Sequence, residues 1–281
     1  MSERNIIDDN SFQFFRELME KRTSNRLDED KIYLVETRLN PVSMQHGFES
    51  VGDMLHALRD ANRRAVIAAP AIEIEIVEAM LVNETYFFRD PKTFDLLERE
   101  LLPDCLKNRT VSRRLRIWSA AASTGQEAYS VAMLLHDRFP EIVANWSVDI
   151  SASDLSRRSL DYGRAALYSD VEVGRGLTDS MKRNFLNSES NKWRVNDSVR
   201  SMVSFTNCHL GDRCLAGPWD VVFLRNVLIY FPDEVRRDIL RRIHATLAHD
   251  GYLILGNTES IYGQDDLFSR TGGSVCCLQP K

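Results

Sequence analysis

Apolar residues recur at helical spacing through the first part of the chain, before any run typical of a strand appears. Three helices are marked by Phe12, Phe15, Leu18 and Met19; by Ile32, Val35 and Leu39, ahead of a stop at Pro41; and by Met54, Leu55 and Leu58 within residues 51–61. A further amphipathic helix begins at Pro70 and ends near Asn83. The pattern predicts an all-helical N-terminal domain over residues 1–69 and a linker over residues 70–90.

From Arg114 onward, short apolar runs alternate with amphipathic segments. The predicted strands are residues 115–120, 147–152, 219–224 and 252–255, and the predicted helices are residues 126–138, 156–166 and 233–248. This alternation is typical of a doubly wound α/β sheet, here spanning residues 91–281. Residues 171–206 break it, and short runs at Trp193–Val195 and Met202–Phe205 indicate a small, mostly β insertion. Residues 274–278 predict a last, antiparallel strand.

The stretch LRIWSAAASTGQEAY, residues 115–129, reads as strand, tight turn and helix. Such a turn places backbone N–H groups and a helix N-terminus at the carboxyl end of a strand, where doubly wound sheets bind nucleotide-like ligands. The single Gly125 is not a G-x-G-x-x-G fingerprint, so tight packing alone also explains the turn.

Polar residues follow several predicted strands at the same edge of the sheet. Glu127 follows the first strand, Asp154 the second and Asn226 a later one. Asp154 suits a ligand for two ribose hydroxyls, although a lone Asp after a strand is by default a turn or N-cap residue. The coincidence of all three favours a ligand pocket.

The stretch NETYFFRD, residues 83–90, places three aromatic residues beside Arg89. Aromatic clusters are usually core, and Arg89 beside Asp90 is compatible with a local salt bridge. Asn83, Thr85 and Arg89 also suit a zwitterionic ligand, because a guanidinium fork matches a carboxylate.

Composition excludes several function classes. The 281-residue chain is 43% hydrophobic and 27% charged, with no apolar run long enough to span a membrane and no signal-peptide pattern at its start. A net charge of -5 gives no basic face for nucleic acid. The odd count of five cysteines, without a C-x-x-C pattern, favours reduced thiols over disulfides or zinc. We expect a cytoplasmic protein with no membrane insertion, no metal and no nucleic-acid partner.

Five motifs together resemble one family, in order, over nearly the whole chain. They are NETYFFRD, RIWSAAASTGQEAYS, ASDLSRRSLDYGRAALY, WDVVFLRNVLIYFP and GYLILGNTES. They are similar to the chemotaxis receptor methyltransferases (CheR). The resemblance implies an α/β, Rossmann-like S-adenosylmethionine-dependent domain with a small antiparallel β-subdomain, preceded by an all-helical receptor-docking domain. The implied activity is methylation of glutamate side chains on the cytoplasmic signalling helices of chemoreceptors, with S-adenosylhomocysteine as the second product.

The resemblance also assigns site residues. The implied cofactor-binding residues are Asn83, Thr85, Arg89, Glu127, Asp154, His209, Leu210, Asn226 and Val227, and the implied catalytic residues are Arg89 and Tyr230. Two positions depart from the family pattern. The turn reads Gln126-Glu127-Ala128 in place of E-E-P, and His209 stands where the family has Asn, so the adenine contact there requires an imidazole or the backbone.

The implied chemistry needs no general base. A glutamate carboxyl, with an ordinary pKa of about 4.3, is already ionised near neutrality. The protein must align that carboxylate and strip it of water, a role that Arg89 and Tyr230 fit. Two other functions stay open: a non-catalytic adaptor that binds the cofactor and signals by protein contact, and a methyltransferase for another carboxylate or a small molecule.

Two features concern how a receptor is reached. The arginine stripe of the family's second helix is thin here: Arg38 remains, and Lys31 is nearby. These basic residues fit either docking or an ordinary solvated surface. Some family members add a receptor C-terminal pentapeptide to the β-subdomain as an edge strand, through a longer, glycine-rich loop. LNSESNKWRV, residues 186–195, has no glycine, so we expect independence from that tether.

Overall fold

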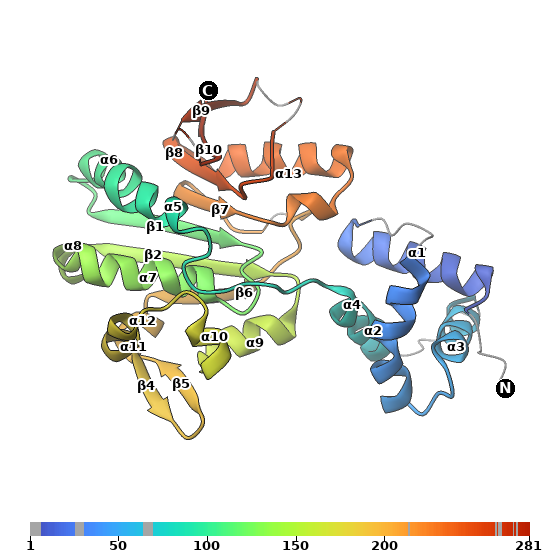
Figure 1. The fold of residues 1–281 in the computed structure, drawn as a ribbon. Coiled ribbons are helices and arrows are strands. Elements are labelled where there is room, and N and C mark those ends of the chain that lie inside the picture. Colours follow the sequence, from blue (N-terminus) through green and yellow to red (C-terminus); the bar gives the residue numbers. More distant parts are fainter. Residues whose placement is uncertain are drawn as a thin grey trace. The chain divides into compact units, whose positions relative to one another are not determined.

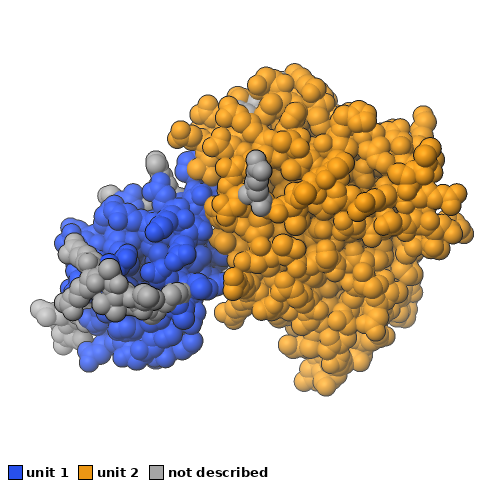
Figure 2. Space-filling model, turned by 180° about the vertical axis from the view of Figure 1, so that it is seen from behind, with its two compact units in different colours: residues 1–82, 230–232 blue, residues 83–229, 233–281 orange. Residues whose placement is uncertain are grey.

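The computed structural model describes residues 7–25, 31–63, 70–212, 214–261, 263, 266–271, 273 and 275–281. The chain divides into two compact units, Met1–Val82 with Tyr230–Pro232, and Asn83–Ile229 with Asp233–Lys281. Figure 2 draws them in blue and orange. Each unit is described separately below.

The first unit is helical. It contains α1 (Asp9–Thr23), α2 (Ile32–Gln45), α3 (Val51–Arg63) and α4 (Pro70–Met80). The apolar residues that marked the first three helices are buried, apart from Ile32, which is half-buried. The Asp8 side chain caps α1 by accepting the Ser11 N–H at 2.9 Å, which satisfies one of the free donors of the first turn.

The expected helix stop at Pro41 is wrong, because α2 continues through it to Gln45. Proline lacks an N–H and costs a helix one hydrogen bond. Pro41 itself is exposed, whereas Val42, the next residue, is 9% exposed beside the fully buried Leu39. Burial of this apolar face offsets the lost bond.

The second unit is built on a seven-stranded sheet (Figure 1). Its strands are β1 (Arg114–Ala120), β2 (Ser147–Asp154), β6 (Val203–Asn207), β7 (Trp219–Leu224), β8 (Leu247–Leu255), β9 (Phe268–Thr271) and β10 (Cys277–Pro280). The order is β6-β2-β1-β7-β8-β10-β9, with parallel neighbours from β6 to β8 and antiparallel pairing at β10. The order reverses direction between β1 and β7, which makes that gap the topological switch point.

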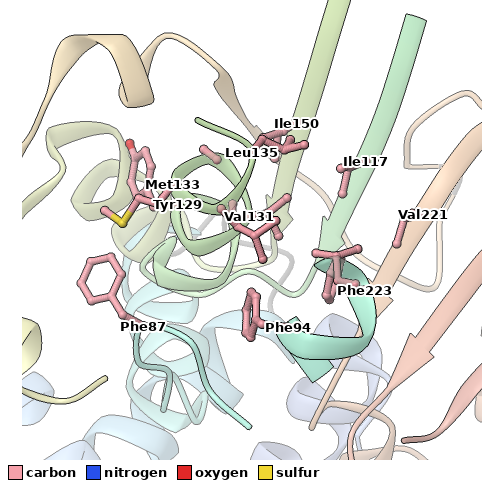
Figure 3. Close-up of a cluster of buried hydrophobic side chains, with 14 of the residues drawn as sticks. Phe87, Phe94, Ile117, Tyr129, Val131, Met133, Leu135, Ile150, Val221 and Phe223 are labelled. Carbon is pink, nitrogen blue, oxygen red and sulfur yellow. The ribbon is translucent and has the colours of Figure 1, made fainter. Parts of the chain in front are cut away.

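Helices precede β1 and connect the strands that follow it. They are α5 (Pro91–Leu96), the π-helix η2 (Leu97–Leu101), α6 (Leu102–Asn108), α7 (Gln126–Arg138), α8 (Pro140–Asn145), α9 (Arg157–Ala165), the 3-10 turn η3 (Leu228–Tyr230) and α13 (Asp233–Thr246). Figure 3 shows the core, where side chains of α7 such as Val131 meet strand residues such as Ile117. Phe94 of α5 stacks on Phe223 of β7 with ring centroids 6.4 Å apart, which fixes the start of α5 against the sheet.

A separate three-stranded sheet forms the β-subdomain, whose β4–β5 hairpin projects from the main sheet (Figure 1). Its strands are β3 (Leu167–Ser169), β4 (Leu186–Glu189) and β5 (Lys192–Val195), paired antiparallel in the order β3-β5-β4. Its neighbours along the chain are α10 (Asp170–Gly174), α11 (Asp179–Phe185) and α12 (Asp197–Arg200). The expected fold class, a Rossmann-like α/β domain with a small antiparallel insertion after an all-helical domain, is confirmed.

Two expectations about the strands need correction. The run Met202–Phe205 does not belong to the insertion, because β6 pairs in parallel with β2 and forms an edge of the main sheet. With one neighbouring strand and mostly exposed side chains, β6 lacks the apolar run that marks a central strand. The last strand is antiparallel as expected, although it begins at Cys277, and Ser274 lies outside the described residues.

The expectation of reduced thiols is also wrong for one pair. Cys208 and Cys214 form a disulfide, with Cα atoms 5.5 Å apart. The chain after β6 turns back on itself and brings the two side chains together, a proximity that neither the odd count nor the spacing of cysteines reveals. The other three cysteines are buried free thiols.

The part of the chain that the structure describes contains neither a membrane-spanning helix nor a cluster of metal ligands. No described helix is both long enough and apolar enough to cross a membrane. No group of three or more His, Cys, Asp or Glu side chains among these residues could hold a metal ion.

Candidate functional site

The strand register brings the carboxyl ends of five parallel strands to one edge of the sheet. Ala120 of β1 lies beside Ser153 of β2 and Leu224 of β7. Asp154 at the end of β2 lies beside Asn207 at the end of β6. The segments that leave these strands therefore meet at one edge, which includes the switch point between β1 and β7.

The turn after β1 is held by hydrogen bonds to three distant segments. The Ser123 N–H donates to Asp154 Oδ2 at 2.8 Å, and the Ser123 hydroxyl donates to the Asn83 carbonyl at 2.8 Å. Tyr168, whose pKa burial raises well above its ordinary value, donates its hydroxyl to the Thr124 carbonyl at 2.6 Å. The turn is thus fixed before any ligand binds.

Gly125 is required at the start of α7. Its φ is 91°, a left-handed conformation that glycine adopts without strain. A Cβ added there would lie 2.9 Å from the Phe205 ring of β6. Tight packing against Phe205 is therefore one reason for a glycine at this position, in agreement with the packing explanation of the turn.

Asp154 already accepts two backbone hydrogen bonds. Its Oδ1 accepts the Ser156 N–H and its Oδ2 accepts the Ser123 N–H, both at 2.8 Å. The residue is 8% exposed. These two bonds give Asp154 the structural role of holding the turn after β1 against the start of α9.

Glu127 lies in the first turn of α7 and is held from two sides. Ser119 Oγ donates to Glu127 Oε1 at 2.7 Å, and Arg225 Nη1 donates to Glu127 Oε2 at 2.9 Å. Arg225 Nη2 also donates to Asp90 Oδ2 at 2.5 Å and to the Arg89 carbonyl at 2.9 Å. The Arg225 side chain is 2% exposed, so this buried guanidinium joins the NETYFFRD stretch to α7.

Within the NETYFFRD stretch, some side chains pack in the core and others form polar contacts. Phe87 is fully buried and meets the Tyr168 ring edge-on at 5.1 Å. The Arg89 guanidinium donates to the Glu84 carbonyl at 2.9 Å, and the expected local salt bridge to Asp90 does not form, because Asp90 pairs with Arg225. Thr85 is half-buried.

The turn after β7 carries Asn226 and Val227. Asn226 has a φ of 58°, in the left-handed region. Its N–H donates to Glu259 Oε2 at 2.7 Å, and the Val227 N–H donates to Glu259 Oε1 at 2.9 Å. Tyr230 is half-buried and ends η3, three residues beyond Val227.

Several buried polar atoms at this edge have no hydrogen-bond partner among the described residues. One is Arg225 Nε, and two others are Asn226 Oδ1 and His209 Nε2. Leu210 follows His209 and is half-buried. A buried polar group without a partner costs free energy, so Asn226 Oδ1 and His209 Nε2 suit a ligand that offers complementary donors or acceptors.

The structure therefore brings Asn83, Glu127, Asp154 and Asn226 to one edge of the sheet. Asn83 and Asp154 both bond to Ser123, and Glu127 bonds to Arg225, the residue before Asn226. Three residues that the sequence did not single out also belong here: Ser119, Arg225 and Glu259. Arg225 and Glu259 lie inside the quoted motifs RNVLIYF and GNTES. For Arg225 the available signal was its position immediately after a buried strand, whereas Glu259 lies four residues beyond β8 and has no such signal.

Comparison with known families decides the identity. Residues 83–277 match the family described as "CheR methyltransferase, SAM binding domain", and residues 10–68 match "CheR methyltransferase, all-alpha domain". The chain belongs to the CheR methyltransferase family. The resemblance drawn from the motifs is thereby confirmed.

Similar proteins cover nearly the whole chain. "Chemotaxis protein methyltransferase Cher2" of Pseudomonas putida is 37% identical over 260 residues, covering 91% of this chain and 92% of that protein. "Chemotaxis protein methyltransferase 1" of Pseudomonas aeruginosa is 38% identical, with the same coverage. "Chemotaxis protein methyltransferase" of Vibrio parahaemolyticus is 37% identical, covering 93% of each chain.

The cofactor of this CheR domain is S-adenosylmethionine. The residues at the edge fit it. Asn226 Oδ1 and His209 Nε2 offer buried polar atoms without a hydrogen-bond partner in the described structure, and the Asp154 carboxylate ends β2, the strand next to β6, which His209 follows. The described residues thus present polar groups of the kinds that an adenosyl amino acid can bond.

Proposed function

We propose that this CheR protein transfers a methyl group from S-adenosylmethionine to glutamate side chains on the cytoplasmic signalling helices of chemoreceptors. The observation that carries the proposal is the convergence of Asn83, Glu127, Asp154 and Asn226 on one edge of a sheet in a chain of this family. The names of its relatives support a place in chemotaxis.

Within the proposal, the side chains divide between binding and alignment. We assign the cofactor to Asn83, Thr85, Arg89, Glu127, Asp154, His209, Leu210, Asn226 and Val227. Arg225 holds Glu127 in position through a buried ion pair at 2.9 Å. Loss of Arg225 would leave buried carboxylates unpaired, so its effect on binding would be indirect.

Arg89 and Tyr230 are assigned to the reacting groups. When bound, S-adenosylmethionine supplies an electrophilic methyl group. The glutamate carboxylate is already ionised, so these two side chains have to orient it and replace part of its water. No general base is needed for this transfer.

The direct test is methyl transfer to receptors. The protein is incubated with methyl-labelled S-adenosylmethionine and receptor-rich membranes, and base-labile methyl esters are counted. We expect label in receptor glutamates, and none when the methylated glutamates are replaced by alanine. Binding of the cofactor without label would support an adaptor, and label in a small carboxylic acid would support another substrate; either outcome contradicts the proposal.

We also propose that the protein does not use a receptor C-terminal tether. The β4–β5 hairpin closes through two residues, Ser190 and Asn191, and Glu189 pairs with Arg194 across it. β4 is an edge strand of the three-stranded sheet, but it has only four residues, and the stretch from Leu186 to Val195 has no glycine that would let the backbone of an added peptide strand approach closely. Calorimetric titration with a receptor C-terminal pentapeptide should give no heat, whereas micromolar binding centred on the β-subdomain would contradict the proposal.

Docking through the helical domain is a further part of the proposal. Lys31 and Arg38 were its candidate residues. Arg38 Nη1 donates to the Met80 carbonyl at 2.7 Å, at the end of α4 in the same unit. Because this guanidinium already satisfies a C-terminal carbonyl, its replacement would disturb the domain as well as any docking surface.

A further inference from the structure

The GNTES segment after β8 forms a polar clamp on the turn that follows β7. The Glu259 carboxylate accepts four backbone hydrogen bonds. Oε2 accepts the N–H groups of Asn226 at 2.7 Å and Gly256 at 2.8 Å. Oε1 accepts those of Val227 at 2.9 Å and Leu228 at 2.7 Å. One side chain thus gathers three consecutive N–H groups of a turn lying about 30 residues earlier in the sequence.

This carboxylate is buried without a cation. Glu259 is 6% exposed, and it has no ion-pair partner among the residues that the structure describes. Burying a charge costs free energy unless hydrogen bonds compensate for the lost water. The four N–H donors therefore offset the cost of burying the Glu259 carboxylate. Consecutive N–H groups following a left-handed residue form a concavity that suits an anion, and the carboxylate fills it.

The clamped turn is unusual in two ways. Asn226 has a φ of 58°, a conformation that is uncommon outside glycine and costs free energy when it is not held. Its Oδ1 is buried and has no hydrogen-bond partner in the described structure. Both features are what one expects of a side chain whose position is fixed for a partner outside the protein.

The neighbouring Gly256 is required by the same arrangement. A Cβ added there would lie 2.8 Å from Asn226 Nδ2 and 2.8 Å from Glu259 Oε2. Its carbonyl also accepts the Glu259 N–H at 2.9 Å, which closes the turn that carries the carboxylate. The G-x-x-E spacing therefore brings the Glu259 carboxylate, without steric conflict, to the Asn226 backbone.

We propose that Glu259 is a positioning residue for the cofactor site: its carboxylate holds the Asn226–Leu228 turn so that the Asn226 side chain is preorganised for S-adenosylmethionine. The inference rests on the proposed role of Asn226 as a cofactor ligand. Glu259 acts through the backbone of the turn and through no contact of its own with the ligand. Preorganisation of this kind lowers the entropy cost of binding.

The experiment is a double-mutant cycle read by calorimetric binding of S-adenosylhomocysteine, which needs no receptor and no turnover. Glu259→Gln keeps the shape of the side chain but turns one acceptor oxygen into an NH₂ group that cannot accept a hydrogen bond. We expect the variant to bind the ligand about tenfold more weakly, the equivalent of losing one hydrogen bond to a charged group. Gly256→Ala, which displaces the same turn with the carboxylate intact, should give a loss of similar size.

The second arm of the cycle separates positioning from general stability. Asn226→Gly removes the side chain while allowing the same φ. If Glu259 acts through Asn226, then Glu259→Gln should cost less than about threefold in affinity in the Asn226→Gly background. Glu234→Gln, on the exposed face of α13, is the matched control and should change neither the affinity nor the melting temperature.

The outcomes are distinguishable. An equal loss of affinity from Glu259→Gln in both backgrounds, or a lower melting temperature with unchanged affinity, would make Glu259 a purely structural residue and overturn the inference. Failure of the unmodified protein to bind S-adenosylhomocysteine would overturn it as well. Failure to methylate receptors, with the cycle as expected, would contradict the proposed substrate alone.

Discussion

At the scale of single residues, the proposed site depends on side chains that have a structural role in the protein and to which we also assign a ligand role. Asp154 accepts two backbone N–H groups, and Glu127 is held by Ser119 and Arg225. A substitution at such a residue changes the protein and its binding site at once. Tests at this scale therefore need a variant that perturbs stability alone.

Asp154→Ala should weaken binding of S-adenosylhomocysteine at least tenfold. The substitution removes charge-assisted hydrogen bonds, each worth roughly 1.5–3 kcal/mol. Isothermal titration calorimetry measures the effect. The control is Thr178→Ala, which removes the hydroxyl that accepts the Met181 N–H at the start of α11. It should lower the melting temperature slightly and leave affinity unchanged; unaltered affinity in Asp154→Ala would reduce Asp154 to a turn residue.

Tyr230→Phe separates chemistry from binding. Because the hydroxyl is assigned to the reacting groups, its loss should lower kcat about three- to tenfold, the value of one hydrogen bond, with cofactor affinity nearly unchanged. Steady-state methylation and calorimetry on the same preparation give both quantities. A parallel fall in both, or no change in either, would remove Tyr230 from the catalytic assignment.

At the scale of elements, close approach between β6 and its neighbouring helices shapes the edge of the sheet. The Phe205 ring lies against Gly125 at the start of α7 and against Gly163 within α9. Neither position has room for a side chain. An edge strand with few buried residues is therefore anchored by one aromatic ring.

Gly163→Ala should lower the free energy of unfolding by about 1–3 kcal/mol, because the added Cβ would lie 2.6 Å from the Phe205 ring. Urea unfolding followed by circular dichroism measures the change. Phe205→Leu in the same chain should recover part of it. Gly174→Ala is the matched control, since nothing lies within 4 Å of the added Cβ, and a loss of equal size there would contradict the steric explanation.

The sequence predicted those helices and strands whose own residues show a clear hydrophobic pattern. Helix α7 and strand β7 have the expected bounds because both are long or fully buried. Strand β6 was misplaced because its residues are half-exposed and its partner β2 is remote in sequence. Asp154 and Asn226 were found because they follow apolar strands. Glu259 was missed because its role depends on a contact with residues about 30 positions away, which no local pattern encodes.

At the scale of the whole molecule, a partly buried ion-pair group joins segments of the sheet domain that are far apart in sequence. Arg109, just after α6, donates to Asp220 at 2.7 Å and to Asp250 at 2.5 Å. Asp220 is 4% exposed and also accepts the Arg116 N–H. This group lies on β7 and β8 at the end opposite the cofactor edge, so it contributes to stability and not to binding.

The contribution of this ion-pair group to the free energy of unfolding should depend on pH. The hydrogen bond from Arg109 lowers the pKa of Asp250 below its ordinary value of 3.8. Between the folded and unfolded pKa values the unfolded state binds more protons, so the stabilisation is complete above about pH 3.8 and is lost as pH falls through the folded pKa.

Arg109→Met should therefore cost about 1–3 kcal/mol at pH 7, between the values for exposed and fully buried pairs, because it leaves one buried and one half-buried carboxylate without their cation. The difference in unfolding free energy from the unmodified protein should shrink as pH falls below 3.8. Urea unfolding at several pH values tests this. A difference that stays constant with pH would mean that Arg109 contributes packing and not charge.

The clamp between Glu259 and the turn after β7 also sets an order of events during synthesis. The cofactor edge draws on segments from Asn83 to Glu259, and its last part is the one that fixes Asn226. Contacts between residues so far apart form late in folding, because long loops must close first. A nascent chain that has not yet exposed GNTES has its sheet strands up to β8 but lacks the group that orders the ligand side chain. The ability to bind S-adenosylmethionine should thus be acquired only after GNTES has been synthesised and has folded onto the turn, and shorter nascent chains would not compete with finished enzyme for it.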